Sequence, residues 1–175
     1  MRHLPQTCVM QTQRFRFRTI LEVLDRFTVE HLVVGGVCAV AHGAPITTFD
    51  LDLVHRRTPG NIDRILASLA ELQAYHREPG DRRLAPRRAA LEGAGPSLFT
   101  TKHGSVDFIG ELSGRGFEQL LPHTVELVLG AKLRILLLDL ETLIEVKQEA
   151  GRPKDIAVLP TLRQTLAENR RQHGG

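Results

Sequence analysis

Two short stretches of the chain decide its fold, and each has the pattern of a strand: His31-Leu32-Val33-Val34-Gly35-Gly36 and Thr47-Thr48-Phe49-Asp50-Leu51-Asp52-Leu53. In the second stretch, Asp50 and Asp52 are separated by one residue, so in a strand both side chains point to the same face. The alternate positions are predicted to point into a core: Phe49, Leu51 and Leu53. Paired carboxylates repel each other unless a cation or a shared proton compensates, and hard oxygen ligands hold Mg²⁺ beside phosphates. The pattern therefore predicts a divalent-metal and nucleotide site.

The glycine pair Gly35-Gly36 separates the first strand from a predicted short helix of small residues, Val37–His42. Glycines at such a junction let backbone N–H groups approach a phosphate, and a helix N-terminus adds partial positive charge. Tight turns use the same pair, so the glycines indicate a phosphate site only in combination with the aspartates, which follow after 13 intervening residues.

A third carboxylate lies in a predicted hairpin, in which Leu98–Thr101 and Ser105–Ile109 flank a turn containing Gly104. Alternation along its second strand places Asp107 and Ser105 on one face. Asp107 would add a metal ligand, or a base that takes the proton from an attacking hydroxyl. The alternative is a surface aspartate on an edge strand.

The composition is that of one compact domain spanning residues 1–175, with 42% hydrophobic residues. Cys8 and Cys38 are too few for a disulfide framework, and Cys38 is predicted to be buried. No apolar run approaches the roughly 20 residues that cross a bilayer, and no secretory signal is evident. We therefore expect a cytoplasmic protein without a membrane partner. An organelle transit peptide over Met1–Ile20 is the alternative.

The net charge is only +3, with a pI near 9.2. The basic residues are nevertheless clustered in two patches: Arg14, Arg16 and Arg18, then Arg82, Arg83, Arg87 and Arg88. Such patches favour a polyanionic partner such as RNA, and the alternative is that they form solvated surface.

Helical patterns flank these strands. Apolar positions from Ile20 to Phe27 predict a first helix, and Thr58 is a predicted cap for a second over Pro59–Leu72. The stretch Glu78–Pro96 lacks periodicity and is predicted to be a loop over the site.

The C-terminal helices, over residues 139–170, are predicted to close the cleft. Asp139 can cap the first of them, and this places Lys147 on its packing face. Asp155 is in register with the apolar positions of the second helix, so a structural Lys147–Asp155 ion pair is one interpretation. In the other, Lys147 reaches a triphosphate, assisted by Arg152 or Lys154.

Jointly, these motifs resemble the nucleotidyltransferase fold superfamily: a strand-end Gly-Gly, an apolar-flanked Asp-x-Asp and a later carboxylate. More narrowly, they are similar to minimal nucleotidyltransferases, which include the AbiEii-type toxins of toxin–antitoxin systems. The segments that carry this likeness are Val34-Gly35-Gly36, Ala41-His42-Gly43, Thr48-Phe49-Asp50-Leu51-Asp52-Leu53 and Lys147…Arg152-Pro153-Lys154-Asp155. The family commonly has a basic residue two positions before the Thr of Thr-x-Asp-x-Asp, and Ile46 stands there in this chain.

The resemblance implies an α/β (α+β) fold, with a mixed twisted sheet, flanking helices and a C-terminal helical extension. It implies transfer of a nucleoside monophosphate from a nucleoside triphosphate (NTP) to an acceptor hydroxyl on RNA such as tRNA, on a protein or on a small molecule. Asp50 and Asp52 would hold two Mg²⁺ ions, or Mn²⁺ in their place, and Asp107 would be a further metal ligand or would activate the acceptor hydroxyl. Residues implied to contact the nucleotide are Gly35, Gly36, Thr48, Lys147, Arg152 and Lys154. A cognate antitoxin is a further implied partner.

Two other functions stay open. A catalytically inactive nucleotide- or RNA-binding member of the same fold would account for Ile46 and the modest charge, although a pure binder gains nothing from three uncompensated carboxylates. A metal-dependent phosphohydrolase would need additional His or Asp ligands. His42, His55 and His103 have no metal-type spacing and are predicted to be packing, turn or surface residues.

Overall fold

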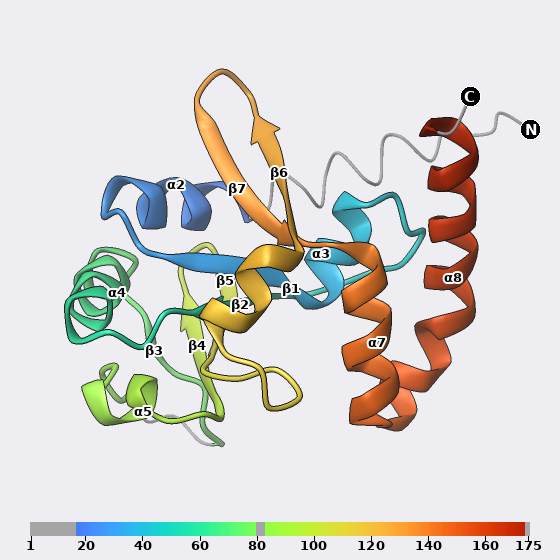
Figure 1. Ribbon diagram of the computed structural model, residues 1–175. Coiled ribbons are helices and arrows are strands. Elements are labelled where there is room, and N and C mark those ends of the chain that lie inside the picture. Colours follow the sequence, from blue (N-terminus) through green and yellow to red (C-terminus); the bar gives the residue numbers. More distant parts are fainter. Residues whose placement is uncertain (1–16, 80–82, 174–175) are drawn as a thin grey trace, which may run out of the picture.

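The computed structural model describes residues 17–79 and 83–173. Within them the chain forms a seven-stranded mixed sheet with seven α-helices and a 3-10 helix, which confirms the predicted fold class (Figure 1). The elements in chain order are α2 (Arg18–Arg26), β1 (His31–Val34), α3 (Gly35–Ala41), β2 (Asp50–His55), α4 (Pro59–Glu71), β3 (Tyr75–His76), α5 (Arg88–Glu92), β4 (Pro96–Thr101), β5 (Gly104–Ile109), α6 (Phe117–Leu120), η1 (Leu121–His123), β6 (Thr124–Leu129), β7 (Leu133–Leu138), α7 (Leu140–Ala150) and α8 (Pro153–His173).

The strand order is β3-β4-β5-β2-β1-β7-β6. The central strand β2 pairs antiparallel with β1 and parallel with β5, while β7 joins the other side of β1 in parallel. The hairpin β4–β5 is antiparallel, as predicted, and so is the hairpin β6–β7. The centre of the sheet is therefore built from segments far apart in the chain, and these bring the predicted site residues together.

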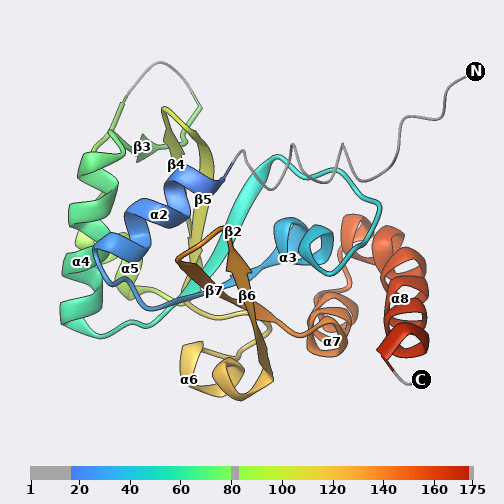
Figure 2. The ribbon, with the colours of Figure 1, turned by 90° about the horizontal axis from the view of Figure 1, so that it is seen from above.

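Helices lie on both faces of the sheet. Viewed from above, α2 and α4 lie on one side of the strands, and α3, α7 and α8 lie on the other (Figure 2). The apolar faces of α2 and α4 are buried through Leu24 and Ile65, and β1 is buried along nearly its whole length. A strand covered on both faces reads as a continuous apolar run, which is why His31–Val34 does not alternate.

Local chemistry explains where several helices begin and end. The Asp139 carboxylate accepts a hydrogen bond from the Thr142 N–H at 2.7 Å, so the predicted cap of α7 is confirmed, and Gly151 ends α7 in the left-handed conformation. Pro59 begins α4 at the position where proline costs no hydrogen bond, but the Thr58 side chain makes no capping bond. Thr58 is thus the N-cap residue, as predicted, although its side chain does not take part in the capping.

Other expectations need adjustment. Helix α3 begins at Gly35, two residues before the predicted start. The stretch predicted as a loop over Glu78–Pro96 contains α5, which packs against α4. None of its described residues before Pro96 lines the cleft described below, so within residues 78–79 and 83–95 the expectation of a loop over the site is not met.

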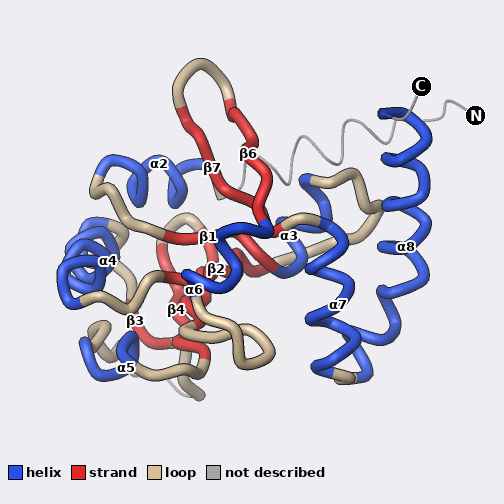
Figure 3. Tube along the Cα trace, viewed as in Figure 1, coloured by secondary structure: helices blue, strands red, loops and turns tan. Residues whose placement is uncertain are grey.

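Elements that the sequence left without a prediction are β3, α6, β6 and β7. The β6–β7 hairpin extends beyond the rest of the sheet (Figure 1), and residues 42–49 form the loop that returns from α3 to β2 (Figure 3). Arg14, Arg16, Arg82, Cys8 and most of the transit-like stretch lie outside the described residues.

Candidate active site

The three aspartates lie on two adjacent parallel strands. Asp52 of β2 stands directly opposite Asp107 of β5 in the strand register, and Asp50 stands opposite Ser105. Their strand neighbours Leu51, Val106 and Phe108 are fully buried on the other face. The predicted alternation is therefore confirmed for both strands, and it places three carboxylates on one face of the sheet.

Phe49 is the exception to this alternation. It was predicted to enter the core, and that prediction is wrong: Phe49 is 65% exposed and lines the cleft. Strand β2 begins one residue later, at Asp50, so Phe49 belongs to the loop and is not held to the alternation of the strand. Its side chain lines the same cleft as the carboxylates and offers apolar surface to a ligand.

The glycine pair makes room for two of the site residues. Gly35 has φ +65°, and a Cβ there would lie only 2.8 Å from Cγ and 2.9 Å from Cβ of Asp52. A Cβ on Gly36 would lie 2.7 Å from Cβ of Thr48. Only glycine fits at either position without displacing the neighbouring side chain. The Gly36 N–H donates a hydrogen bond to the Asp52 carboxylate, so this backbone group serves the aspartate in the ligand-free protein.

Arg77 is a site residue that the sequence analysis did not find. It directly follows β3, and its backbone N–H donates to the Leu98 carbonyl of β4 at 2.9 Å. One terminal nitrogen of its guanidinium donates to Oδ1 of Asp50 at 3.2 Å, and the other donates to Oδ1 of Asp107. The fork of a single arginine therefore bridges two of the three carboxylates. No local pattern marks this residue, because its partners are 27 and 30 positions away in the chain.

Two of the three aspartates have raised pKa values. Burial raises the pKa of Asp52, and the charge of Asp50 adds to the effect, while the charges of Lys147 and Lys154 and the Gly36 hydrogen bond oppose it. Burial raises the pKa of Asp107 to about 6, against the lowering effect of Arg77. The cations present therefore leave the negative charge of the site incompletely compensated.

Helices α7 and α8 and the turn between them contribute three cations to the lining of the cleft. Lys147 Nζ lies 2.9 Å from Oδ1 of Asp155, and Arg152 Nε lies 2.5 Å from Oδ2 of the same carboxylate. The predicted Lys147–Asp155 ion pair is therefore confirmed. Asp155 is only 1% exposed, and although burial raises its pKa, the hydrogen bonds from Lys147 and Arg152 outweigh burial and lower it. Lys154 lines the same cleft, is exposed and forms no ion pair with any described residue.

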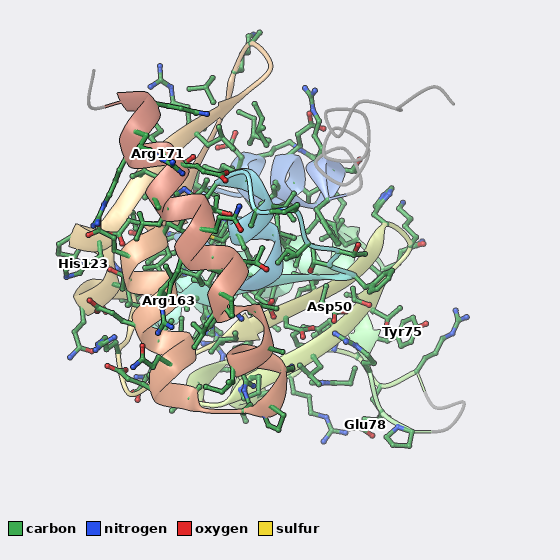
Figure 4. All side chains as sticks on the ribbon, turned by 90° about the vertical axis from the view of Figure 1, so that its right-hand side faces the viewer. Asp50, Tyr75, Glu78, His123, Arg163 and Arg171 are labelled. Atoms are coloured by element: carbon green, nitrogen blue, oxygen red, sulfur yellow. The ribbon has the colours of Figure 1, made fainter. Side chains whose placement is uncertain are left out.

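The carboxylates and the cations line opposite walls of one cleft of about 1120 Å³, which is large enough for a nucleotide with part of an acceptor. Figure 4, viewed from the side of α8, labels Asp50 on the sheet beside that helix in projection. Both glycines, Thr48, Ile46 and the helix residues Val146 and Val158 also line it. All nine residues predicted for the site therefore lie in this one cleft.

The donor chemistry fits Mg²⁺, because three carboxylates share a face and two of them have raised pKa values. In residues 17–79 and 83–173, however, no group of three acidic, histidine or cysteine side chains is arranged to hold a metal ion. In the same site, the Arg77 guanidinium binds Oδ1 of Asp50 and Oδ1 of Asp107.

The other polar candidates have structural roles. His42 Nε2 lies 2.8 Å from the Leu138 carbonyl, and His55 Nε2 lies 2.8 Å from the Leu91 carbonyl. Cys38 is buried, as predicted, and burial raises the pKa of its thiol. Of the basic patches, Arg18 pairs with Glu22 at 2.7 Å, and Arg88 pairs with Asp63. These contacts neutralise part of the basic surface.

No protein-family model matches the chain, and no curated protein matches it. Within the described residues, no helix combines the length and the apolar character needed to cross a membrane.

Proposed function

We propose that the protein is a metal-dependent nucleotidyltransferase, which moves a nucleoside monophosphate from an NTP to an acceptor hydroxyl. The observation that carries this proposal is the pairing of Asp52 with Asp107 on parallel strands, with Asp50 on the same face and the cations of α7 and α8 across the cleft. Acidic ligands on one wall and cations on the other suit a metal-bound triphosphate, whose phosphates need both.

In the proposed reaction, the acceptor oxygen forms a bond to the α-phosphorus in line with the bond that breaks, and pyrophosphate leaves with the electrons of that bond. Mg²⁺, bound by Asp50, Asp52 and Asp107, would supply charge stabilisation for the entering and leaving oxygens. Asp107 is alternatively the base that takes the proton of the acceptor hydroxyl, a role open to it only where it does not bind the metal. Lys154 is placed to neutralise phosphate charge from the opposite wall.

Phe49 supports a nucleotide as the ligand. An exposed phenyl ring beside the carboxylates can stack on a base, and aromatic–base stacking contributes roughly 1–3 kcal/mol in proteins that bind single-stranded nucleic acids. Gly35 and Gly36 also line the cleft, and their backbone N–H groups would be available to a phosphate once Asp52 binds a metal.

A second candidate function is a catalytically inactive nucleotide- or RNA-binding protein of the same fold, including one partner of a toxin–antitoxin pair. One observation favours it: Arg77 satisfies Asp50 and Asp107, and an arginine that permanently replaced the metal would leave a binding cleft without turnover. Ile46 in place of a basic residue points the same way.

The test is to incubate the purified protein with each α-labelled NTP, Mg²⁺, and total cellular RNA with lysate protein. The matched control is the Asp50→Ala/Asp52→Ala variant. We expect label on an RNA or protein band with the wild type only, together with release of pyrophosphate. Release of orthophosphate without transfer would instead indicate a hydrolase. Nucleotide binding that depends on metal, without transfer to macromolecules or to small hydroxyl compounds, would favour the inactive binder.

A further inference from the structure

Arg77 lies where the proposed function requires a divalent cation. Its two terminal nitrogens bind Oδ1 of Asp50 and Oδ1 of Asp107, so each carboxylate spends one oxygen on the guanidinium. Asp52, the third aspartate, is in strand register with Asp107 and is not bound by Arg77. The guanidinium therefore occupies one oxygen of each carboxylate and places a positive charge beside them, so it competes with a metal ion for these groups.

One polar group of the Arg77 side chain lacks a hydrogen-bond partner in this conformation. Its Nε–H is buried and has no hydrogen-bond partner among the described residues, which removes part of the gain from the two carboxylate contacts. The side chain is 33% exposed and lines the cleft. The backbone of Arg77, in contrast, is held by the hydrogen bond to Leu98. Rotation of the side chain alone would therefore release the carboxylates without disturbing the sheet.

The charge of a bound triphosphate would attract the guanidinium once it leaves the carboxylates. Lys147 and Arg152 are already bound to Asp155, so within the described residues Lys154 is the cation of the α7–α8 wall that is free for phosphate. A triphosphate carries more negative charge than one lysine neutralises, and a planar guanidinium binds phosphate oxygens in a bidentate manner. Ile46 supplies no charge at the position where a basic residue would be expected.

We propose that Arg77 is an exchangeable cation of the site: it holds Asp50 and Asp107 in the ligand-free protein, and on binding of metal and NTP it transfers to the triphosphate. This inference rests on the proposed function, because it assigns the same carboxylates to the metal. The exchange would explain why the site contains three carboxylates suited to Mg²⁺, while in the described residues no group of three such side chains is arranged to hold a metal ion.

The first measurement is the binding of Mn²⁺ alone to the wild type, R77Q and R77K. Electron paramagnetic resonance of the free ion reports how much Mn²⁺ is bound. The matched control is R115Q, because Arg115 is also 33% exposed and pairs with Glu149, a carboxylate of the same cleft. We expect R77Q to bind Mn²⁺ roughly tenfold more tightly than the wild type, since it no longer competes for the carboxylates. R77K should lie between them, and R115Q should stay within about twofold of the wild type.

The second measurement is binding of α,β-methylene ATP and GTP in the presence of Mg²⁺. We expect R77Q to bind the preferred nucleotide more weakly than R115Q does, which is the opposite direction to its effect on Mn²⁺. Equal Mn²⁺ affinity of R77Q and the wild type, with both variants folded by circular dichroism, would overturn the exchange. Tighter Mn²⁺ binding by R77Q without nucleotidyl transfer by the wild type would support the exchange and reject the reaction. Absence of Mn²⁺ binding in every variant would reject both.

Discussion

Gly35 determines how closely the backbone can approach Asp52. Its φ of +65° costs an L-residue energy, and an added Cβ would meet the Asp52 side chain within 3 Å. We therefore expect Gly35→Ala to lower the free energy of unfolding by roughly 2–4 kcal/mol, from backbone strain plus overpacking. Gly60→Ala is the matched control, because a Cβ there meets nothing within 4 Å. Urea unfolding of both variants measures the difference, and equal stabilities would contradict the close approach.

Asp107 makes stability depend on pH. Its pKa is raised from 3.8 to about 6, chiefly by burial, so the folded protein binds the proton more tightly than the unfolded chain does. The stabilisation from the protonated form is complete below about pH 4 and is lost as the pH rises towards 6. D107N has no such proton to lose, so in metal-free buffer its melting temperature should rise relative to that of the wild type between pH 4 and 6. Above pH 6 the difference between the two melting temperatures should stay constant. The change corresponds to at most about 3 kcal/mol. A difference independent of pH would refute the raised pKa.

At the scale of elements, the contact between α7 and α8 depends on one buried carboxylate. Asp155 on α8 is bound by Lys147 on α7, which is 16% exposed, and by Arg152, which is 58% exposed. Removing the more buried partner leaves the charge of Asp155 poorly compensated. We expect K147M to reduce stability by about 2–4 kcal/mol and R152Q by less than about 1 kcal/mol. Because the pKa of Asp155 is lowered, the loss in K147M should be present at neutral pH and fade below about pH 3.8.

Urea midpoints at pH 7 and pH 3 measure both effects. The double variant K147M/D155L separates an ion pair that holds the helices from a general effect of the substitution. It should recover most of the stability, since an apolar pair of similar volume can replace a buried ion pair. If K147M and R152Q lower the free energy of unfolding equally, the difference in burial between Lys147 and Arg152 does not determine their contributions to stability.

At the scale of the whole molecule, the cleft joins the sheet to the C-terminal helices, so a bound ligand should stabilise both together. Mg²⁺ with the preferred NTP at 100 times its dissociation constant adds about 2.7 kcal/mol, which is a rise in melting temperature of roughly 5–10 °C for a chain of this length. The rise should disappear with EDTA and in the Asp50→Ala/Asp52→Ala variant. A rise that survives both treatments would mean that the nucleotide binds without the carboxylates.

Much of the architecture was predictable because its signals are local. The strand at His31–Val34, the hairpin around Gly104 and the cap at Asp139 depend on residues within a few positions of one another. The α/β class was also predictable, and so was the common face of Asp50 and Asp52, since alternation along a strand follows from backbone geometry.

The amino-acid sequence by itself thus determined the strands that present the three aspartates and the glycines beside them, while it left the Lys147–Asp155 pair as one of two interpretations. Only the tertiary structure decided which groups meet these residues: it placed Arg77 between Asp50 and Asp107 and left Phe49 exposed in the cleft. The physical reason is that hydrophobic periodicity and capping act over one or two turns of chain. The partners of a long cationic side chain depend instead on which carboxylates lie near it in space, and this is settled only when sheet pairing joins distant segments.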